Sequence, residues 1–124
     1  MQMTSDIQGD LLVVTPQEER LDAAGALAFK EQMHSHINAH ADRIVLDLGH
    51  VLFLDSSGLG ALVAVMKALG GTRKLELASC QPAVLKVLKL TRMDSVFTIH
   101  ATDPTPPGMA AAGQAAFLAA SGSK

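Results

Sequence analysis

Short apolar runs that alternate with segments of helical periodicity limit the fold of this chain more than any other feature. Runs of four or five residues rich in branched apolar side chains are typical of buried strands. Four such runs lie at 11–14, 44–48, 75–78 and 96–99, and a fifth apolar run covers 51–54. The sequence therefore predicts four strands and a short fifth apolar segment.

The first segment between these runs repeats apolar residues every three or four positions, as an amphipathic helix does. Ala26, Phe29, Met33 and Ile37 share one face of it. Asp22 precedes them and is a candidate N-cap, because its carboxylate could accept a free backbone N–H of the first turn.

Two further segments have the same periodicity. One ends at Gly70-Gly71, where glycine can take the left-handed conformation that closes a helix. The other begins at Pro82, which is favourable in a first helical turn. Their apolar positions are Leu59, Leu62, Val63, Met66 and Leu69, and then Val84, Val87 and Leu88.

Strands that alternate with helices of this length indicate an α/β fold, with a mixed, mainly parallel sheet and helices packed on it. The 124 residues fit one domain. We expect residues 1–100 to form its core. Residues 101–124 are rich in proline and alanine, and there 109–120 could form a last helix before a disordered end.

Charge, cysteine usage and hydropathy exclude several classes of protein. Ten Lys and Arg against twelve Asp and Glu give a formal charge of −2, so no basic field favours nucleic acid as a partner. The single cysteine, Cys80, fits a reducing cytoplasm. No apolar run approaches the roughly 20 residues of a membrane span, and the N-terminus has no secretory signal. We therefore expect a cytoplasmic protein without direct membrane insertion.

The few large aromatic side chains fall in predicted strands and on a predicted helical core face. The chain has no Trp, no Tyr and four Phe. Phe29 falls on a helical core face, and Phe53 and Phe97 fall in strand-like runs. Few aromatic residues then remain to line a pocket, and we expect no cofactor. Cys80 has no cationic neighbour in the sequence and is expected to be a buried packing residue.

The segment most informative about function is an apolar run that ends in Asp55-Ser56-Ser57-Gly58-Leu59-Gly60 and opens a helix. Either serine could cap free backbone N–H groups, which by itself is the simpler interpretation. A helix N-terminus also accepts negative charge. A phosphate on a serine here would leave the fold intact, yet its charge of about −1.5 to −2 would repel an apolar or acidic partner surface.

The motif gains weight from its context. A Gly-Gly pair follows at 70–71, then L-E-L-A at 75–78, P-A-V-L-K-V-L at 82–88 and F-T-I at 97–99. In this combination the chain resembles the STAS domain family from about residue 8 to residue 100. Among its members the chain is most similar to the bacterial anti-sigma factor antagonists.

The resemblance implies a substrate rather than an enzyme. Antagonists of this type bind an anti-sigma factor that is also an ATP-binding serine/threonine kinase, and binding frees the sigma factor. The kinase phosphorylates the serine directly after the aspartate, which is Ser56 here. The phosphorylated form no longer binds until a serine phosphatase restores it.

The resemblance also implies a set of partner-binding residues and no catalytic or metal-binding ones. Asp22 matches the aspartate of a family G-E-L-D turn near the phosphorylation site, although Glu19 and Arg20 stand in place of the Gly-Glu pair. The partner-binding residues on this interpretation are Asp22, Asp55, Ser56, Ser57, Gly58 and Leu59.

Other interpretations fit less well. The runner-up is a STAS subunit that stays bound to a lipid-transport ATPase without a phosphorylation switch. A response-regulator receiver is more distant, because no lysine follows the run at 96–99. A serine hydrolase would need a G-x-S-x-G elbow, which is absent. His36 and His40 are four residues apart but lack the glutamate of an H-E-x-x-H zinc motif.

Overall fold

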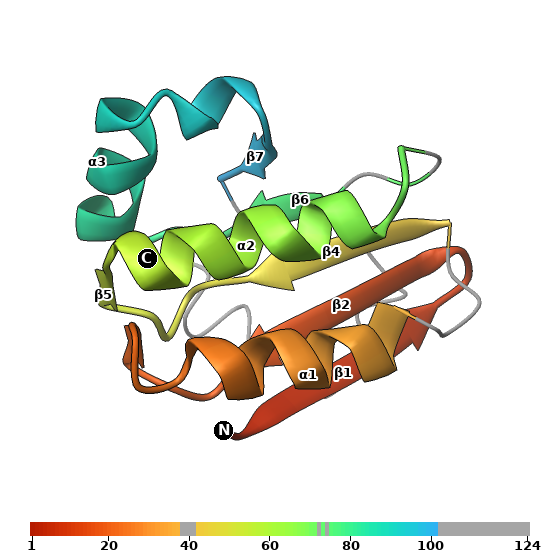
Figure 1. The fold of residues 1–124 in the computed structure, drawn as a ribbon. Coiled ribbons are helices and arrows are strands. Elements are labelled where there is room, and N and C mark those ends of the chain that lie inside the picture. The colour runs from red at the N-terminus through yellow and green to blue at the C-terminus, as the bar shows by residue number, and fades with distance from the viewer. Residues whose placement is uncertain (38–41, 72, 74, 102–124) are drawn as a thin grey trace, which may run out of the picture.

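A five-stranded sheet in the order β1-β2-β4-β6-β7 forms the centre of the structure (Figure 1). The computed structural model describes residues 1–37, 42–71, 73 and 75–101. β1 is antiparallel to β2, and every other neighbouring pair is parallel. This is the mixed, mainly parallel sheet that the sequence predicts. Its strands are β1 (Met3–Gln8), β2 (Leu11–Pro16), β4 (Arg43–Asp47), β6 (Leu75–Ala78) and β7 (Thr98–His100).

The apolar runs did not predict β1. Its central residues are all exposed, so it lacks the buried face that marks a strand in a sequence. Its backbone nevertheless pairs with β2 along all six residues of the strand. The link is the two-residue turn Gly9-Asp10, in which Gly9 has a φ of +66°. A glycine-aspartate pair between two strands is the local signal that could have revealed this hairpin.

Helices α1 (Ala26–Ile37) and α2 (Ser56–Ala68) lie side by side over one face of the sheet (Figure 1). Helix α3 (Pro82–Leu90) and the short 3₁₀ helix η1 (Met93–Ser95) connect β6 to β7. The three predicted helices are therefore confirmed. None of the helices in the described ranges is long and apolar enough to cross a membrane.

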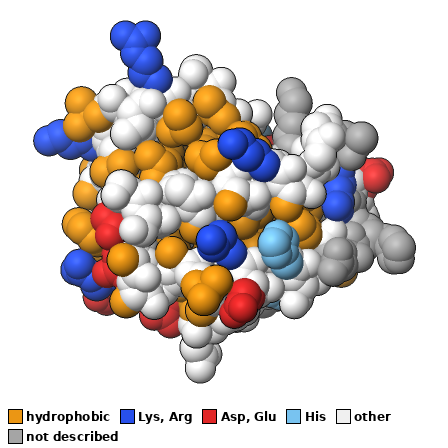
Figure 2. All heavy atoms as spheres, viewed as in Figure 1, with side chains coloured by type: hydrophobic (Ala, Val, Ile, Leu, Met, Phe, Trp, Pro, Cys, Tyr) orange, Lys and Arg blue, Asp and Glu red, His pale blue; other side chains and the backbone are white. Residues whose placement is uncertain are grey.

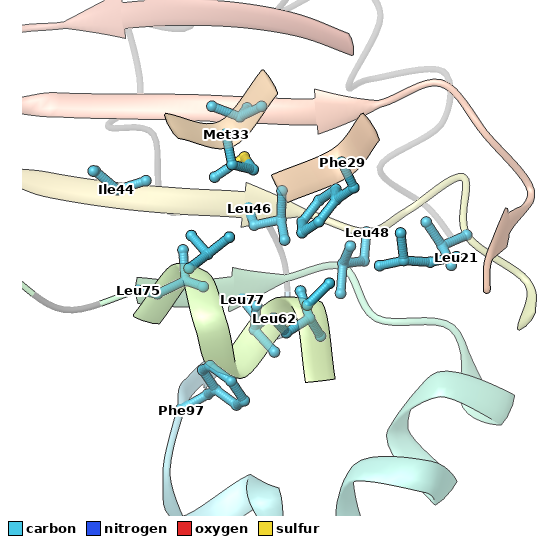
Figure 3. Close-up of a cluster of buried hydrophobic side chains, with 14 of the residues drawn as sticks. Leu21, Phe29, Met33, Ile44, Leu46, Leu48, Leu62, Leu75, Leu77 and Phe97 are labelled. Carbon is cyan, nitrogen blue, oxygen red and sulfur yellow. The ribbon is translucent and has the colours of Figure 1, made fainter. Parts of the chain in front are cut away.

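The core lies between this face of the sheet and the helices (Figure 3). Phe29 and Met33 project from α1 and Leu62 from α2 toward apolar side chains of the sheet, and all three are fully buried. Phe97 is also buried. Phe53 lies in a strand, as its apolar run predicts, but its side chain is 41% exposed. Cys80 is half-buried, and its burial, with a smaller effect of the Asp47 charge, raises the pKa of the thiol to about 11.

A second, two-stranded sheet lies beside the first. β3 (Arg20–Leu21) and β5 (Phe53–Leu54) pair in parallel, so that Leu21 is opposite Leu54. The short apolar run at 51–54 thus contributes a strand to this small sheet and not to the main one. Because β5 leads directly into α2, the pairing fixes where that helix begins.

The predicted N-cap at Asp22 is wrong. Helix α1 begins four residues later, at Ala26. The Asp22 Oδ1 atom accepts a hydrogen bond from the Ala24 backbone N–H (3.2 Å), and the Asp22 carbonyl accepts one from Gly25 (3.0 Å). An aspartate that bonds the N–H two residues on forms a separate turn. Asp22 therefore shapes the turn between β3 and α1 instead of capping the helix.

The predictions for the end of the chain fall on residues 102–124, which lie outside the described residues. The division into a core at 1–100 and a C-terminal segment at 101–124 stays a prediction.

Candidate functional site

The candidate site lies where β5 ends and α2 begins. Asp55 has extended backbone and is the N-cap of α2, and its Oδ1 atom accepts a hydrogen bond from the Gly58 backbone N–H (2.9 Å). The Asp55 carbonyl accepts the first helical bond, from Leu59 (2.9 Å). The cap is therefore Asp55, and neither of the two serines that the sequence offered for this role performs it.

Ser56 and Ser57 are the first two residues of α2, and both are exposed. Within the described residues, neither hydroxyl makes a hydrogen bond to a protein group. Since Asp55 already satisfies a free N–H of the first turn, the helix does not depend on these hydroxyls. The serines are available to another molecule.

The same carboxylate joins α2 to the turn at Asp22. The Asp55 Oδ2 atom accepts a hydrogen bond from the Ala23 backbone N–H (3.3 Å), and the Asp55 N–H donates to the Leu21 carbonyl (3.3 Å). Residues 22 and 55 are far apart in the sequence, and the β3–β5 pairing brings their backbones together. The structure thus places the Asp22 turn directly beside the start of α2.

Gly58 makes this close approach sterically feasible. A Cβ atom at Gly58 would lie 2.1 Å from the Leu21 carbonyl oxygen and 2.8 Å from the Leu54 Cδ1 atom. Real Cβ atoms do not come so close to backbone, so only glycine fits here without moving β3 or α2. Gly58 is buried, and its lack of a side chain lets the start of α2 pack against β3. Leu59 beside it is half-buried against the core.

Arg20 and Phe53 form one rim of the site, and the apolar runs of the sequence did not reveal it. They are opposite each other in the β3–β5 pairing, and the Arg20 guanidinium carbon lies 4.3 Å from the centre of the Phe53 ring. The Arg20 Nε atom also donates to Asp22 Oδ2 (3.0 Å), and this hydrogen bond is the main reason why the pKa of Asp22 is lowered. In the sequence, the one indication of this contact was Arg20, which stands where the G-E-L-D turn of the STAS family has its glutamate.

Figure 2 shows the surface of this region. Acidic and basic side chains are interleaved with hydrophobic ones at the left edge, where Figure 1 places β3 and β5. Hydrophobic side chains also gather over α2 and α3 on this face. The half-buried apolar residues of these two helices include Leu59, Val63, Met66 and Val87. Next to the start of α2, the protein therefore presents both charged and apolar groups.

A second polar cluster lies on the opposite face of the main sheet. In β6, Leu75 and Leu77 face the core, so Glu76 between them projects from the other side. Its carboxylate accepts two hydrogen bonds from the Arg43 guanidinium (2.7 and 2.9 Å), and the His100 Nε2 atom lies 2.6 Å from Glu76 Oε1. The cluster joins β4, β6 and β7.

These contacts change the ionisation of the cluster. The Arg43 hydrogen bonds, opposed by burial and assisted by His100, hold the pKa of Glu76 below its ordinary value. The same pair raises the pKa of Arg43. Short-range sequence patterns did not reveal this cluster, because its three members are far apart in the chain.

The described residues contain no group of three His, Cys, Asp or Glu side chains placed to hold a metal ion. His34 and His36 lie in the last turn of α1, where a positive charge is favourable, and His40 lies outside the described residues.

Comparison with known proteins identifies the family. The chain belongs to the STAS domain family, whose model matches residues 2–104. A STAS-domain containing protein of Pseudomonas aeruginosa (strain UCBPP-PA14) is 38% identical over 58 residues, which are 46% of this chain and 57% of that protein. The matched part is thus little more than half of that relative.

Solved structures of anti-sigma factor antagonists have the same fold. The structure from Mycobacterium paratuberculosis has a TM-score of 0.73 at 25% identity, and the match covers 82% of this chain and 86% of that one. A domain protein of the same kind from Planctomyces limnophilus has a TM-score of 0.74 at 21% identity, covering 96% and 97%. The structural neighbours support the predicted family and α/β fold.

Proposed function

We propose that this protein is an anti-sigma factor antagonist controlled by phosphorylation of Ser56. The unphosphorylated form binds an anti-sigma factor that is also an ATP-binding serine/threonine kinase, and so releases the sigma factor. Phosphorylation of Ser56 ends this binding, and a serine phosphatase restores it. The protein acts by binding and not as an enzyme, and its place of action is the cytoplasm. The observation that carries the proposal is an exposed Ser56 hydroxyl at a helix start that Asp55 already caps.

The reaction at Ser56 is a phosphoryl transfer. The Ser56 Oγ atom attacks the γ-phosphorus of ATP, the bond from this phosphorus to the β–γ bridging oxygen breaks, and ADP leaves. The hydroxyl proton passes to a base of the kinase, as in other kinases. Because the kinase supplies ATP and the base, this chain needs only to expose the Ser56 hydroxyl to the kinase active site. It does so at the first position of α2, with no hydrogen bond to another described residue to break.

The phosphorylated form should keep its fold and lose its partner. Free N–H groups and the helix dipole at the start of α2 favour an anion there. The phosphate adds about −1.5 to −2 charges beside the Asp55 carboxylate and near Asp22, whose own charge is paired with Arg20. A partner that covers this surface would have to desolvate the dianion, which costs several kcal/mol.

The proposed docking surface consists of Asp22, Asp55, Ser56, Ser57 and Leu59, with Gly58 behind them. Asp55 and Gly58 position the others, Asp55 through its bonds to the Gly58 and Ala23 N–H groups, and Gly58 by allowing α2 to approach Leu21. Similarity to a solved anti-sigma factor antagonist supports an anti-sigma factor as the partner, and the kinase activity of that partner is part of the proposal.

Mapping of phosphate tests the proposal. The parent protein, Ser56→Ala and Ser57→Ala are incubated with ATP in a native cell extract, and modified residues are mapped by mass spectrometry. We expect phosphate on Ser56 in the parent and in Ser57→Ala, and none on this site in Ser56→Ala. A parent protein without phosphate on Ser56 would contradict the proposal.

A pull-down experiment distinguishes the proposed antagonist from the alternative, a STAS subunit of a lipid-transport ATPase. The parent is immobilised and exposed to the extract with ATP or with ADP. We expect an ATP-binding kinase among the retained proteins. Retention of a membrane-transport ATPase in its place would favour a regulatory subunit without a switch.

A further inference from the structure

Helix α2 contains two glycines with opposite surroundings. A Cβ atom at Gly58 would collide with the Leu21 carbonyl, whereas a Cβ atom at Gly60 would meet nothing within 4 Å. Gly60 is exposed. Its φ is not in the left-handed region, which among the described glycines only Gly9, Gly70 and Gly71 occupy. Neither packing nor backbone conformation in the described chain requires glycine at position 60.

Glycine at this position is unfavourable for the helix itself. Gly60 lies in the interior of α2, between Ser56 and Ala68. In a helix interior glycine is less stable than any other residue except proline, because it loses the most backbone freedom. A residue that weakens the helix and is not needed by its own chain suggests a requirement set by another molecule.

The position of Gly60 on α2 indicates that the molecule that requires a glycine here is the kinase that modifies Ser56. Positions three and four apart are neighbours on a helix surface, so Gly60 lies next to both Ser57 and Ser56. For phosphoryl transfer, the Ser56 oxygen must come within about 3–3.5 Å of the γ-phosphorus. The walls of the kinase active site must therefore close around Ser56, and a side chain at position 60 would stand in their way.

We infer that Gly60 is a specificity-determining residue for the phosphorylation of Ser56, because it leaves the helix surface beside the serine bare for the active-site wall of the kinase. This inference rests on the proposed function. It adds to that function a residue that contributes to partner access and not to the stability of the chain.

Substitution of Gly60 should change stability and phosphorylation in opposite directions. Gly60→Ala and Gly60→Gln should both raise the melting temperature by a few degrees, since either residue favours a helix and has free space. In the extract with ATP, the initial rate of phosphate incorporation at Ser56 should fall about threefold for Gly60→Ala and about tenfold for Gly60→Gln. Lys67→Ala, an exposed change two turns further along α2, is the control and should keep the parent rate.

The outcomes separate this inference from the proposed function. Parent protein without phosphate on Ser56 overturns both. Phosphate on the parent, with rates for both Gly60 variants within about twofold of it, overturns the inference alone. A lower melting temperature in both variants also overturns it, because glycine would then serve the fold. Higher melting temperature together with slower phosphorylation supports it.

Discussion

Two carboxylates organise two polar clusters of different character. At the start of α2, Asp55 accepts backbone N–H groups from Gly58 and Ala23. In the main sheet, Glu76 is bound by the side chains of Arg43 and His100. The Asp55 cluster uses backbone donors and leaves Ser56 exposed, whereas Glu76 is only 7% exposed and is bound by side chains, among them the Arg43 guanidinium.

The difference shows where a new charge can be accommodated. A cap that relies on backbone donors stays intact when a neighbouring serine is modified, and the helix N-terminus favours the added anion. A nearly buried ion pair does not tolerate such a change, because loss of one partner leaves the other poorly compensated. The fold thus separates a region suited to regulation from one that holds strands together.

The largest effect is expected at Gly58. Gly58→Ala places a Cβ atom against the Leu21 carbonyl, so β3 or α2 must move. We expect the free energy of unfolding to fall by about 3 kcal/mol, at the upper end for overpacking. Urea denaturation measures it, with Gly60→Ala as the matched control, for which no loss is expected. Equal stability of the two variants would show that the close approach of α2 to β3 is not present in solution.

A smaller loss is expected when the Glu76 charge is removed. Glu76→Gln keeps the size of the side chain but weakens its bonds to Arg43 and His100, and we expect a loss of about 1–3 kcal/mol. The exposed Glu31→Gln is the control and should change little. A loss no larger than that of the control would mean that the cluster does not stabilise the sheet.

The pH dependence of stability should come partly from the same residue. The pKa of Glu76 is lower in the folded protein than its ordinary value of 4.5. The contribution of Glu76 is then complete above that value and is lost as the pH falls through its folded pKa. Urea titrations between pH 7 and pH 3 should show a shallower acid loss in Glu76→Gln than in the parent. Parallel curves for the two proteins would contradict this assignment.

The cap of α2 should contribute about as much as caps do in other proteins. Asp55→Ala removes acceptors for the Gly58 and Ala23 N–H groups, and we expect a loss of about 1 kcal/mol. Asp55→Asn retains one oxygen that can accept from the Gly58 N–H, but its amide nitrogen cannot accept from Ala23, so we expect a loss between those of the parent and the alanine variant. If the asparagine variant lost as much as the alanine variant, the hydrogen bond from Gly58 would not be the stabilising feature, and the charge of Asp55 or its bond from Ala23 would be.

Local patterns predicted much of the fold. Buried apolar runs identified β2, β4 and β6, and helical periodicity identified α1 to α3. They missed β1 because its exposed residues carry no strand pattern and only its turn at Gly9-Asp10 marks it. The run at 51–54 does contribute a strand, but an apolar run does not tell which strand it pairs with, and so it did not predict the exposure of Phe53.

Only part of the candidate site could be predicted in the same way. The motif at 55–60 located the start of α2, but not that Asp55 is the cap. The Arg20–Phe53 contact and the Arg43–Glu76–His100 cluster depend on strand pairing between distant segments. A single sequence contains no local pattern for such contacts.

The smallest effect on stability is expected at Ser56. The comparison of the parent with Ser56→Asp and Ser56→Asn is also the most informative one. We expect Ser56→Asp to change the free energy of unfolding by no more than about 0.5 kcal/mol, because the site is exposed and lies at a helix N-terminus. Ser56→Asn has nearly the same shape without the charge and is the matched control. Thermal and urea denaturation of the three proteins measure the effect.

Binding of the same three proteins to the kinase retained from the extract tests the central claim most directly. The account predicts that Ser56→Asp binds at least about tenfold more weakly than the parent, while Ser56→Asn keeps most of the affinity. If Ser56→Asp is as stable as the parent and binds the kinase just as tightly, a charge at Ser56 is not the switch.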